Sequence, residues 1–266
     1  MQHKKIINSL LSFLAASLFF TSCKKESSTA PPVTPPPQKQ VVSIEYSNAP
    51  GNPINFSYDT KGRVISSGNA YFSMNCDYSG TSFHSLYTSF ATNYTSELKN
   101  GVTDAAGRLL DADVVLKMPG QPDNFYKYHL DYDAQGHLVQ FSNTSLQSGN
   151  ISLDVNTWSN GDLISSVNTI NGQPNYRLEY TYYDSLPNKI NLDILPPVLQ
   201  FFSAGLTGTR STHLLKMETN FKEPQHTKQT EDLYEYELDL KGYPAKFKVK
   251  GQLQNYTVER TLQYNL

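Results

Sequence analysis

The sequence predicts an all-β protein: an antiparallel meander of hairpins, curled into a barrel or half-barrel, with one short apolar helix. Three observations support this fold class. The chain of 266 residues contains 18 tyrosines and 13 phenylalanines, and aromatic side chains favour pleated surfaces. Apolar and polar residues alternate with a period of two in many segments, as they do in strands with one buried face. Asp-x-x-Gly and Asn-Gly turns separate these segments.

Residues 1–22 form the expected leader. Lys4 and Lys5 precede a nearly continuous apolar run, which is typical of a secretory signal peptide. The run is shorter than the about 20 residues that a membrane-spanning helix needs. Thr21 and Ser22 lie directly before Cys23 and resemble the bacterial lipobox, in which a peptidase cuts before the cysteine and the thiol carries the lipid. We therefore expect Cys23 to be lipidated; the alternative is an ordinary signal peptide with an incidental cysteine.

Residues 23–40 comprise the lipidated cysteine and a Pro-rich tether. Five prolines among Ser, Thr and Gln residues cannot form a core and favour an extended chain of about 3.1 Å per residue. Acyl chains on Cys23 would hold the tether at a membrane, because each buried CH₂ contributes roughly 0.8 kcal/mol. The expected location is the cell envelope at the outer membrane, either periplasmic or surface-exposed. Residues 41–266 are enough for a single β domain.

Charge and cysteine content bear on the function classes. Two of the 22 basic residues, Lys4 and Lys5, lie in the leader, so the mature chain keeps 20 basic against 24 acidic residues and a net charge of −4. Proteins that bind nucleic acid carry a basic surface, so no nucleic-acid partner is expected. Cys76 has no cysteine to pair with once Cys23 is lipidated. We expect it to be a small buried residue rather than a nucleophile, because the neighbouring Asp77 disfavours a thiolate.

A strand-and-turn unit recurs along the domain. In residues 126–138, YKYHLDYDAQGHL, Tyr and Leu alternate with polar residues up to Asp133, and the segment from Asp133 to Gly136 then turns the chain. Asp bonds the backbone two residues on, and Gly accepts a positive φ. The other units turn at residues 59–62, 104–107, 160–161 and 239–242. Their unequal spacing excludes a solenoid or propeller and favours a meander whose edges close by curling.

The last of these units predicts a strand register. A hairpin that is symmetric about the bond between Gly242 and Tyr243 places acids opposite lysines on one face and apolar residues opposite each other on the other. The expected pairs are Asp239 with Lys246, Glu237 with Lys248, Glu235 with Lys250, Leu240 with Ala245, Leu238 with Phe247, and Tyr236 with Val249. A slip by one residue would destroy both sets, so the pattern fixes which residues share a face. We expect the charged face to meet solvent.

One segment looks helical. Within residues 191–208, an apolar stripe follows the i, i+3, i+4, i+7 spacing of a helix through Leu195, Val198, Leu199 and Phe202. Gly205 suits the end of this helix. An apolar helix in a β protein is expected to plug or cover the sheet, and the sharper alternative is a lid over a lipid pocket.

The ordered set of these segments is similar to a known family. It comprises FSYDTKGRVIS, LDYDAQGHLVQ, NTWSNGDLISSVN, LEYTYYDSLPNKINLD, the apolar helix and YEYELDLKGYPAKF. It resembles, from roughly residue 41 to the C-terminus, a Bacteroidota lipoprotein family of unknown function that is described as having a porin-like fold. The single turns also resemble, more loosely, the tyrosine-aspartate repeats of bacterial toxin shells. The resemblance implies a curved or barrel-like antiparallel sheet and no assigned catalytic residues.

The strand pattern does not favour a barrel that spans a membrane. Spanning strands need about ten residues and an apolar lipid-facing band. Here one strand face carries charged residues such as Lys127, Asp131, Arg177 and Glu179, while the other face is rich in tyrosine and looks like a core. A lipid anchor would also be redundant for an integral barrel.

The sequence contains none of the common catalytic motifs: no G-x-S-x-G, no H-E-x-x-H, no phosphate-binding glycine loop and no C-x-x-C. His129 and Asp131 share a strand face near His137 and could form a metal pair. Asp111 and Asp113 could mimic paired glycosidase acids. A solvated polar face explains both patterns better, so we expect no enzyme activity, no metal and no cofactor. Lipidation of Cys23 is the one site that the sequence predicts.

Two functions remain open. The first is a non-enzymatic binding or assembly module, anchored to the membrane through Cys23, whose partner is a glycan or an envelope protein. Trp158 and the tyrosines could stack on sugar rings, although core packing is their commoner role. The second is a carrier of apolar or lipid molecules, with the sheet wrapped around a cavity and residues 195–206 as its lid.

Overall fold

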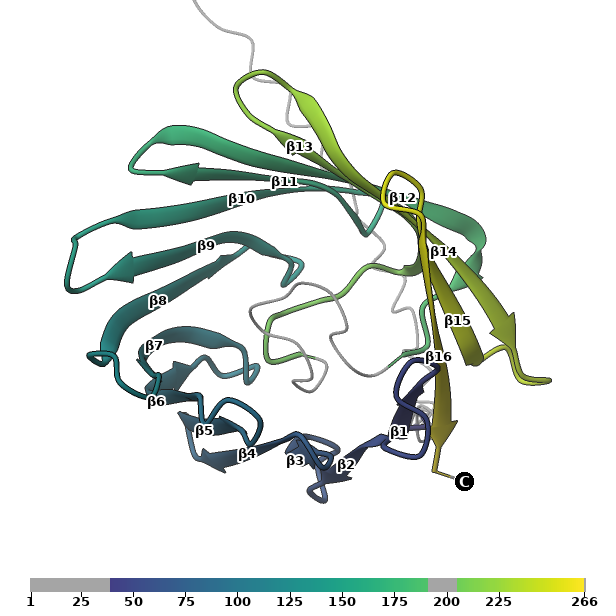
Figure 1. Ribbon diagram of the computed structural model, residues 1–266, viewed down its shortest axis with the longest axis horizontal. Helices are drawn as coiled ribbons and strands as arrows, with labels where there is room; N and C mark the ends of the chain where they lie inside the picture. Colours follow the sequence, from purple (N-terminus) through teal and green to yellow (C-terminus); the bar gives the residue numbers. More distant parts are fainter. Residues whose placement is uncertain (1–38, 191–204, 266) are drawn as a thin grey trace, which may run out of the picture. The chain divides into compact units, whose positions relative to one another are not determined.

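The computed structural model describes residues 39–190 and 205–265, which form one closed antiparallel barrel of 16 strands (Figure 1). Each strand pairs with its neighbours in sequence, and β1 pairs with β16 to close the ring. The predicted meander that curls into a barrel is therefore confirmed. Closure pairs every strand on both sides and removes the exposed edges that an open sheet would present.

Most strands span eight or nine residues, whereas β1 to β3 have five or six and β12 has 15. The strands are β1 (Val41–Tyr46), β2 (Ile54–Tyr58), β3 (Val64–Gly68), β4 (Phe72–Ser79), β5 (Ser82–Ser89), β6 (Thr95–Thr103), β7 (Leu109–Lys117), β8 (Asn124–Tyr132), β9 (Leu138–Ser145), β10 (Ile151–Ser159), β11 (Asp162–Ile170), β12 (Gln173–Pro187), β13 (His213–Lys222), β14 (Thr227–Leu238), β15 (Pro244–Gly251) and β16 (Tyr256–Tyr264).

Because the number of antiparallel strands is even, the start of β1 and the end of β16 lie at the same rim of the barrel, which we call the turn rim. The Asn265 backbone N–H donates to the Gln40 carbonyl at 3.0 Å, and the Gln40 N–H donates to Asn265 Oδ1 at 2.8 Å. The recurring turns at residues 59–62, 104–107, 133–136, 160–161 and 239–242 all lie at this rim, because they alternate along the chain with the connections of the opposite rim. We call the opposite rim, which carries connections such as 118–123 and 252–255, the far rim.

Each Asp-x-x-Gly turn is held by its aspartate. Asp133 Oδ1 accepts the backbone N–H groups of Gln135 and His137 at 2.9 and 2.8 Å, and Oδ2 lies 2.9 Å from His137 Nδ1. Gly136 supplies the positive φ, +86°, that ends the turn. Asp59 and Asp239 hold their turns through the same backbone bonds.

The turn at Asp104 has the same geometry, although Thr103 stands where other units have an aromatic residue. Asp104 accepts the N–H groups of Ala106 and Arg108 at 2.9 Å and the Arg108 Nε–H at 2.7 Å. Burial alone would raise the pKa of Asp104, but the backbone and guanidinium bonds from Arg108 hold it below its usual value. The carboxylate is therefore part of the turn's structure.

An aromatic residue at the end of a later strand packs on each turn and donates a hydrogen bond to a backbone carbonyl next to it. We call this contact an aromatic clamp. The Arg108 guanidinium lies 4.7 Å from the Tyr132 ring centre, and the Tyr132 hydroxyl donates to the Leu109 carbonyl at 2.7 Å. His137 stacks on Trp158 at 4.3 Å, and the indole Nε1–H donates to the Leu138 carbonyl at 2.9 Å. The clamp thus joins neighbouring hairpins and explains why Tyr or Trp recurs before the turns.

The same clamp occurs on both sides of the closing seam, which is the pairing of β1 with β16. The Tyr264 ring packs on Tyr243 at 5.3 Å, and its hydroxyl donates to the Pro244 carbonyl at 2.9 Å. The Tyr58 hydroxyl donates to the Val41 carbonyl, at the start of the first strand. Clamps therefore secure the strands that meet where the barrel closes.

Residues 205–213 bind to three of the turns at the turn rim. The Leu109 N–H donates to the Leu206 carbonyl at 2.8 Å, and the Thr209 N–H donates to the Gly136 carbonyl at 2.7 Å. The Thr212 N–H donates to the Gly161 carbonyl at 3.1 Å. Of the segment 191–208 that was predicted to be helical, residues 191–204 lie outside the described residues, and Gly205 and Gly208 pair across a short turn.

The predicted register of the last hairpin is wrong by two residues. Glu237 pairs with Lys246 and Glu235 with Lys248, while Tyr236 pairs with Phe247. The reason is the turn itself, because Asp239 and Tyr243 already bond to each other across it and a bulge at Leu238 takes up the remaining slack. A shift of two preserves the face of every side chain, so the acids and lysines do lie together on the outer wall. Leu240, expected to be inward, is fully exposed in the turn.

The inner face carries an apolar core over most of the barrel, but β10 and β11 reverse the expected polarity. Leu130 and Phe247 are almost fully buried on the inner face of their strands. On β10, by contrast, Asp154 points inward, paired with buried Phe141, while Ile151 and Val155 are 47% and 45% exposed on the outer wall. The expectation that the apolar set is always the core is therefore wrong for these two strands.

The clamps should carry measurable stability. Tyr132→Phe keeps the ring that packs on Arg108 but removes the hydroxyl donated to the Leu109 carbonyl. We expect the free energy of unfolding to fall by about 1 kcal/mol, because a partly buried carbonyl loses its partner. Urea denaturation followed by intrinsic fluorescence would measure it. Tyr71→Phe, at a ring that is 57% exposed, is the control, and an equal loss in both variants would contradict the clamp.

Candidate functional site

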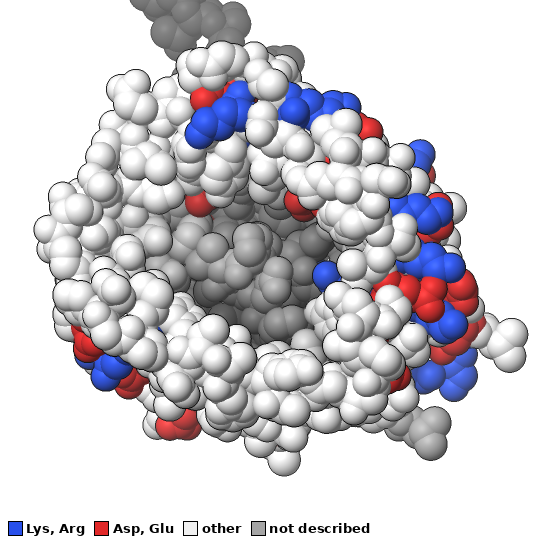
Figure 2. Space-filling view, viewed as in Figure 1, with Lys and Arg blue, Asp and Glu red and all other residues white. Residues whose placement is uncertain are grey.

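The interior of the barrel near the far rim is the candidate site. Figure 2 looks into the barrel and shows a hollowed mouth with Asp and Glu side chains on its inner wall. Pairing across strands β10 to β16 places a set of polar residues on this inner face, which we call the polar inner wall. It consists of Asp154, Asn168, Tyr176, Glu218, Asn220, Asp232, Tyr256 and Arg260.

The first part of the polar inner wall is a hydrogen-bond network around Asp154. The Asn168 Nδ2–H and the Tyr176 hydroxyl both donate to Asp154 Oδ1 at 3.0 Å. Asn168, only 1% exposed, also accepts from Asn175 at 2.8 Å. Burial raises the pKa of Asp154, and the bonds from Asn168 and Tyr176 offset only part of that rise. The network holds a carboxyl rigidly on the inner face.

The second part centres on Glu218 of β13. Glu218 pairs with Tyr180 on one neighbouring strand and with Asp232 on the other, so two carboxyl groups stand side by side. Burial first, and then the charge of Asp232, raise the pKa of Glu218 to about 7. Glu218 therefore changes charge near neutral pH.

The third part lies on β14 to β16. Gly251 pairs with both Asp232 and Tyr256, and a Cβ on Gly251 would meet the Tyr256 ring at 2.2 Å. The ring therefore lies over the glycine, and its hydroxyl donates to Asp232 Oδ1 at 2.7 Å. Arg260 lies with its guanidinium over the rings of Tyr46 and Phe247, at 4.9 and 5.1 Å.

Some polar atoms of the interior have no protein partner. Asn143 Oδ1, Asn220 Oδ1 and Arg260 Nε are inaccessible to solvent, and each lacks a hydrogen bond within the part of the chain that the structure describes. Orphaned buried polar groups are rare in native proteins, because each costs about 1–3 kcal/mol. A bound ligand or water would satisfy them.

Strands β4 to β9 lie across the barrel from β13 and β14 (Figure 1), and aromatic rings line their inner face. Phe72 stacks on Tyr87 at 5.4 Å, and Tyr128 meets Phe141 edge to face at 5.0 Å. One side of the interior thus offers aromatic faces and the other offers carboxyls, amides and hydroxyls. Such a lining suits a ligand that has both apolar faces and hydroxyl or amine groups.

The candidate residues on β7 and β8 lie on the outer wall. His129 contacts Asp111 at 2.7 Å through Nδ1 and Asp131 at 3.2 Å through Nε2, and its side chain is 51% exposed. The bond to Asp111, opposed by slight burial and helped by Asp131, raises the pKa of His129. Asp113 instead accepts from Asn100 at 2.7 Å. Asp111 and Asp113 therefore do not form an acid pair, in agreement with a solvated face.

His137 does not join His129, because it belongs to the turn of Asp133 and to the clamp of Trp158. Among the described residues, no group of three His, Cys, Asp or Glu could hold a metal ion. Trp158 packs on His137 in the clamp, so of its two predicted roles, sugar stacking and packing, the structure shows packing. Cys76 is buried as expected, and burial raises the pKa of its thiol to about 12.

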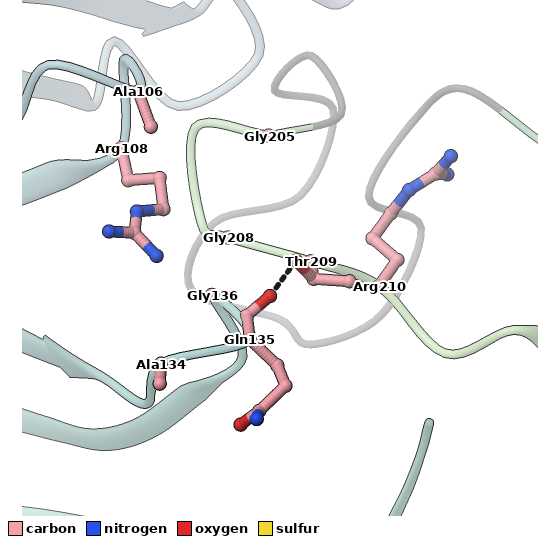
Figure 3. Close-up of a pocket in the computed structure, with 9 residues that line it drawn as sticks. All are labelled: Ala106, Arg108, Ala134, Gln135, Gly136, Gly205, Gly208, Thr209 and Arg210. Atoms are coloured by element: carbon pink, nitrogen blue, oxygen red, sulfur yellow. Dashed lines mark hydrogen bonds between the residues drawn. The ribbon is translucent and has the colours of Figure 1, made fainter. Parts of the chain in front are cut away.

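A second hollow, of about 490 Å³, lies at the turn rim between the turns of β6–β7 and β8–β9 and residues 205–210 (Figure 3). Figure 3 shows Arg108 and Arg210 on either side of the chain at Gly208 and Thr209, so their guanidinium groups do not converge. Arg108 is also paired with Asp104 at 2.6 Å. This hollow therefore offers no focused charge for a ligand.

Solved structures with the same fold come from Bacteroides. A porin-like protein from Bacteroides uniformis has a TM-score of 0.55 and 11% identity, and the match covers 85% of this chain and 96% of that one. A porin-like protein from Bacteroides vulgatus has a TM-score of 0.60 and 13% identity, covering 85% and 99%. The fold is porin-like. Identities this low show the fold alone, so the lipoprotein family and the tyrosine-aspartate repeats stay predictions.

No protein-family model matches the sequence, and no curated protein matches it. Within the described residues, no helix is long and apolar enough to cross a membrane.

The polar inner wall was not predicted from the sequence. Its acids lie in segments such as KMETNFK and TEDLYEY, where period-two alternation looks the same whether the polar face is inside or outside. The one available signal is in β10, where Ile151, Leu153 and Val155 alternate with Ser152 and Asp154. The inward Trp158 on that same strand shares its parity with Asp154, which marks the polar residues as the inner ones.

Replacing Glu218 should stabilise the protein at alkaline pH. With a folded pKa of about 7, against a usual value of 4.5, the folded chain keeps a proton that the unfolded chain releases. Stability therefore falls as pH rises through this window. Glu218→Gln removes the titration, so its free energy of unfolding should exceed that of the parent by about 2–3 kcal/mol at pH 8 and by little at pH 5.

Chemical denaturation at the two pH values would measure this difference. Glu235→Gln is the matched control, because that carboxylate lies on the outer wall, 2.6 Å from Lys250 Nζ. If Glu218→Gln raised the free energy of unfolding by the same amount at both pH values, the result would contradict a buried carboxyl that titrates between them.

Proposed function

We propose that this protein is a lipid-anchored, non-enzymatic binding protein of the cell envelope, whose barrel interior takes up a glycan. The observation that carries the proposal is the polar inner wall, where Asn220 Oδ1 is orphaned among the described residues, together with the orphaned Oδ1 of Asn143 on β9. Sugars present hydroxyl groups to carboxyls and amides and apolar ring faces to aromatic side chains. The interior offers both kinds of partner, on opposite sides.

The outer wall supports a barrel that stands in water. On β15 and β16, Lys248 and Glu259 lie in mid-strand, and their charged groups are 3.2 Å apart. Figure 2 shows Lys, Arg, Asp and Glu gathered on the outside over β14 to β16. A Lys or Arg facing lipid at the bilayer centre costs about 2–4 kcal/mol, so a row of charges disfavours insertion. Strands β1 to β3, of five or six residues, are also shorter than the about 9–11 that a span needs.

A lipid on Cys23 would then supply the membrane attachment, and Gln40, near the first of the described residues, lies at the turn rim. The fold shared with porin-like proteins from Bacteroides supports an outer-membrane or envelope setting. The membrane, through this lipid, and the glycan are the partners of the proposal.

A carrier of apolar molecules is less well supported. Carboxyl groups such as Asp154, Glu218 and Asp232 on the inner face would lose water to an apolar cargo without gaining a partner. An assembly module that binds another envelope protein would use the outer wall. The uncharged stretch over β9 to β11, with Ile151, Val155 and Ile164 exposed, is the surface with the composition for that role.

Lipidation is tested by labelling. Cells that express the full chain and receive a radiolabelled fatty acid should incorporate it into the parent and into Cys76→Ala, but not into Cys23→Ala, because only Cys23 follows the lipobox-like residues. Incorporation that persists in Cys23→Ala would contradict the anchor.

Glycan binding is tested with the mature chain from residue 24, which lacks the acceptor cysteine. We expect at least one glycan on an array to bind. Asn220→Ala should lower the affinity for that glycan by about tenfold, because an amide on the inner face is lost. Gln140→Ala, on the outer face of β9, should leave binding unchanged. A chain that binds no glycan at millimolar concentration would refute this version of the function.

A further inference from the structure

Glu218 has no hydrogen-bond or ion-pair partner in the described part of the chain, which is unusual for a carboxyl inside a barrel. No hydrogen bond or ion pair joins it to any of the residues that the structure describes, whereas Asp154 and Asp232 each accept from a tyrosine hydroxyl. A charge out of full contact with water is normally paired or hydrogen-bonded, since its desolvation is otherwise uncompensated. Of the three acids of the polar inner wall, Glu218 is therefore the one that a ligand would satisfy most, because Asp154 and Asp232 already accept hydrogen bonds through Oδ1.

Tyrosines surround this carboxyl. Tyr180 pairs directly with Glu218 across β12 and β13, and Tyr234 lies two residues from Asp232 on the same face of β14. Burial first, and then the charge of Glu218, raise the pKa of Tyr180 and Tyr234, which places both rings within its field. A carboxylate among aromatic rings is the arrangement by which proteins hold ammonium groups, because the rings attract a cation through their faces.

A second polar group points to the same kind of ligand. Asn220 lies two residues from Glu218 on β13, on the same inner face, and its Oδ1 is inaccessible to solvent and has no partner. Asn220 Oδ1 is an acceptor, so its missing partner is a donor. On a cationic sugar, a hydroxyl group beside the charged nitrogen would supply that donor while the positive charge attracts Glu218.

The charged and titratable groups that face Glu218 also favour a cationic ligand. They are Tyr176, Tyr180 and Tyr182 on β12, Asp232 and Tyr234 on β14, and Tyr256 on β16. The cations of the same inner face bind elsewhere: the Arg260 guanidinium lies on the rings of Tyr46 and Phe247, and Lys222 donates to Asn175 Oδ1 at 3.1 Å. A cation on the ligand would offset the repulsion between the two neighbouring carboxyls.

We propose that the ligand of the barrel interior carries a cationic nitrogen, as an amino sugar does, and that Glu218 binds it among the rings of Tyr180 and Tyr234. This inference rests on the proposed glycan-binding function and specifies its ligand class. The ionisation of Glu218 near neutral pH then links affinity to pH, because only the carboxylate attracts the cation.

Two tetrasaccharide probes test the proposal. One is a glucosamine tetramer with trimethylated nitrogens, whose charge is the same at every pH, and the other is the neutral N-acetylated tetramer. Titration calorimetry with the mature chain should give at least about tenfold tighter binding of the charged probe at pH 8. This preference should shrink at pH 5.5, where Glu218 is protonated.

Glu218→Gln should abolish both the preference and its pH dependence, and Glu218→Asp should retain part of both. Glu235→Gln, which removes the same charge from the outer wall, should retain them fully. Equal binding of the two probes would overturn the ammonium assignment and leave the proposed glycan function standing. If neither probe binds and the array is also empty, the proposed function fails with it. A preference lost equally in Glu218→Gln and Glu235→Gln would reflect overall charge and would overturn the assignment as well.

Discussion

The pairing of β1 with β16 is the constraint on which the rest of the structure depends. Until those strands meet, the sheet has two unpaired edges and no inside, and a meander of this length would expose both. Closure is held by more than the ladder: Tyr58 donates to the Val41 carbonyl on one side of the seam, and Tyr264 donates to the Pro244 carbonyl on the other. Once the ring is closed, each strand face is either interior or exterior.

Much of this architecture could be predicted from local sequence, and the parts that could not depend on closure. Asp133 and Gly136 specify their turn through bonds within five residues, so the turns and the antiparallel order were predictable. The register of the last hairpin was wrong because pairing arguments do not show the bulge at Leu238, yet the two-residue error kept the face of the paired acids and lysines. Alternation reports which residues share a face, but not which face is inside, and so Glu218 could not be placed.

Stability and recognition are assigned to different ends of the same strands. The clamps, the aspartate turns and the bonds from residues 205–213 all lie at the turn rim. The polar inner wall runs from the far rim, where Asp154 and Tyr256 lie near the start of their strands, to Glu218 and Asp232 in the middle of theirs. Because each hairpin is fixed at the turn rim, the far half of a strand can carry polar inward residues without loss of register.

This division accounts for the reversed polarity of β10 and β11. A strand whose inner face is polar gains little from burial, and the apolar side chains on its outer face gain little either. Ser152, Asp154 and Asn168 compensate by bonding to one another, and Trp158 contributes its clamp at the turn rim. The remaining desolvation cost falls on groups that have no partner among the residues the structure describes, chiefly Glu218 and the amide oxygen of Asn220. A protein that only had to close a barrel would place apolar residues there, as it does at Leu130 and Phe247. The acceptors that stay unpaired among the described residues are the groups that the proposed ligand would satisfy.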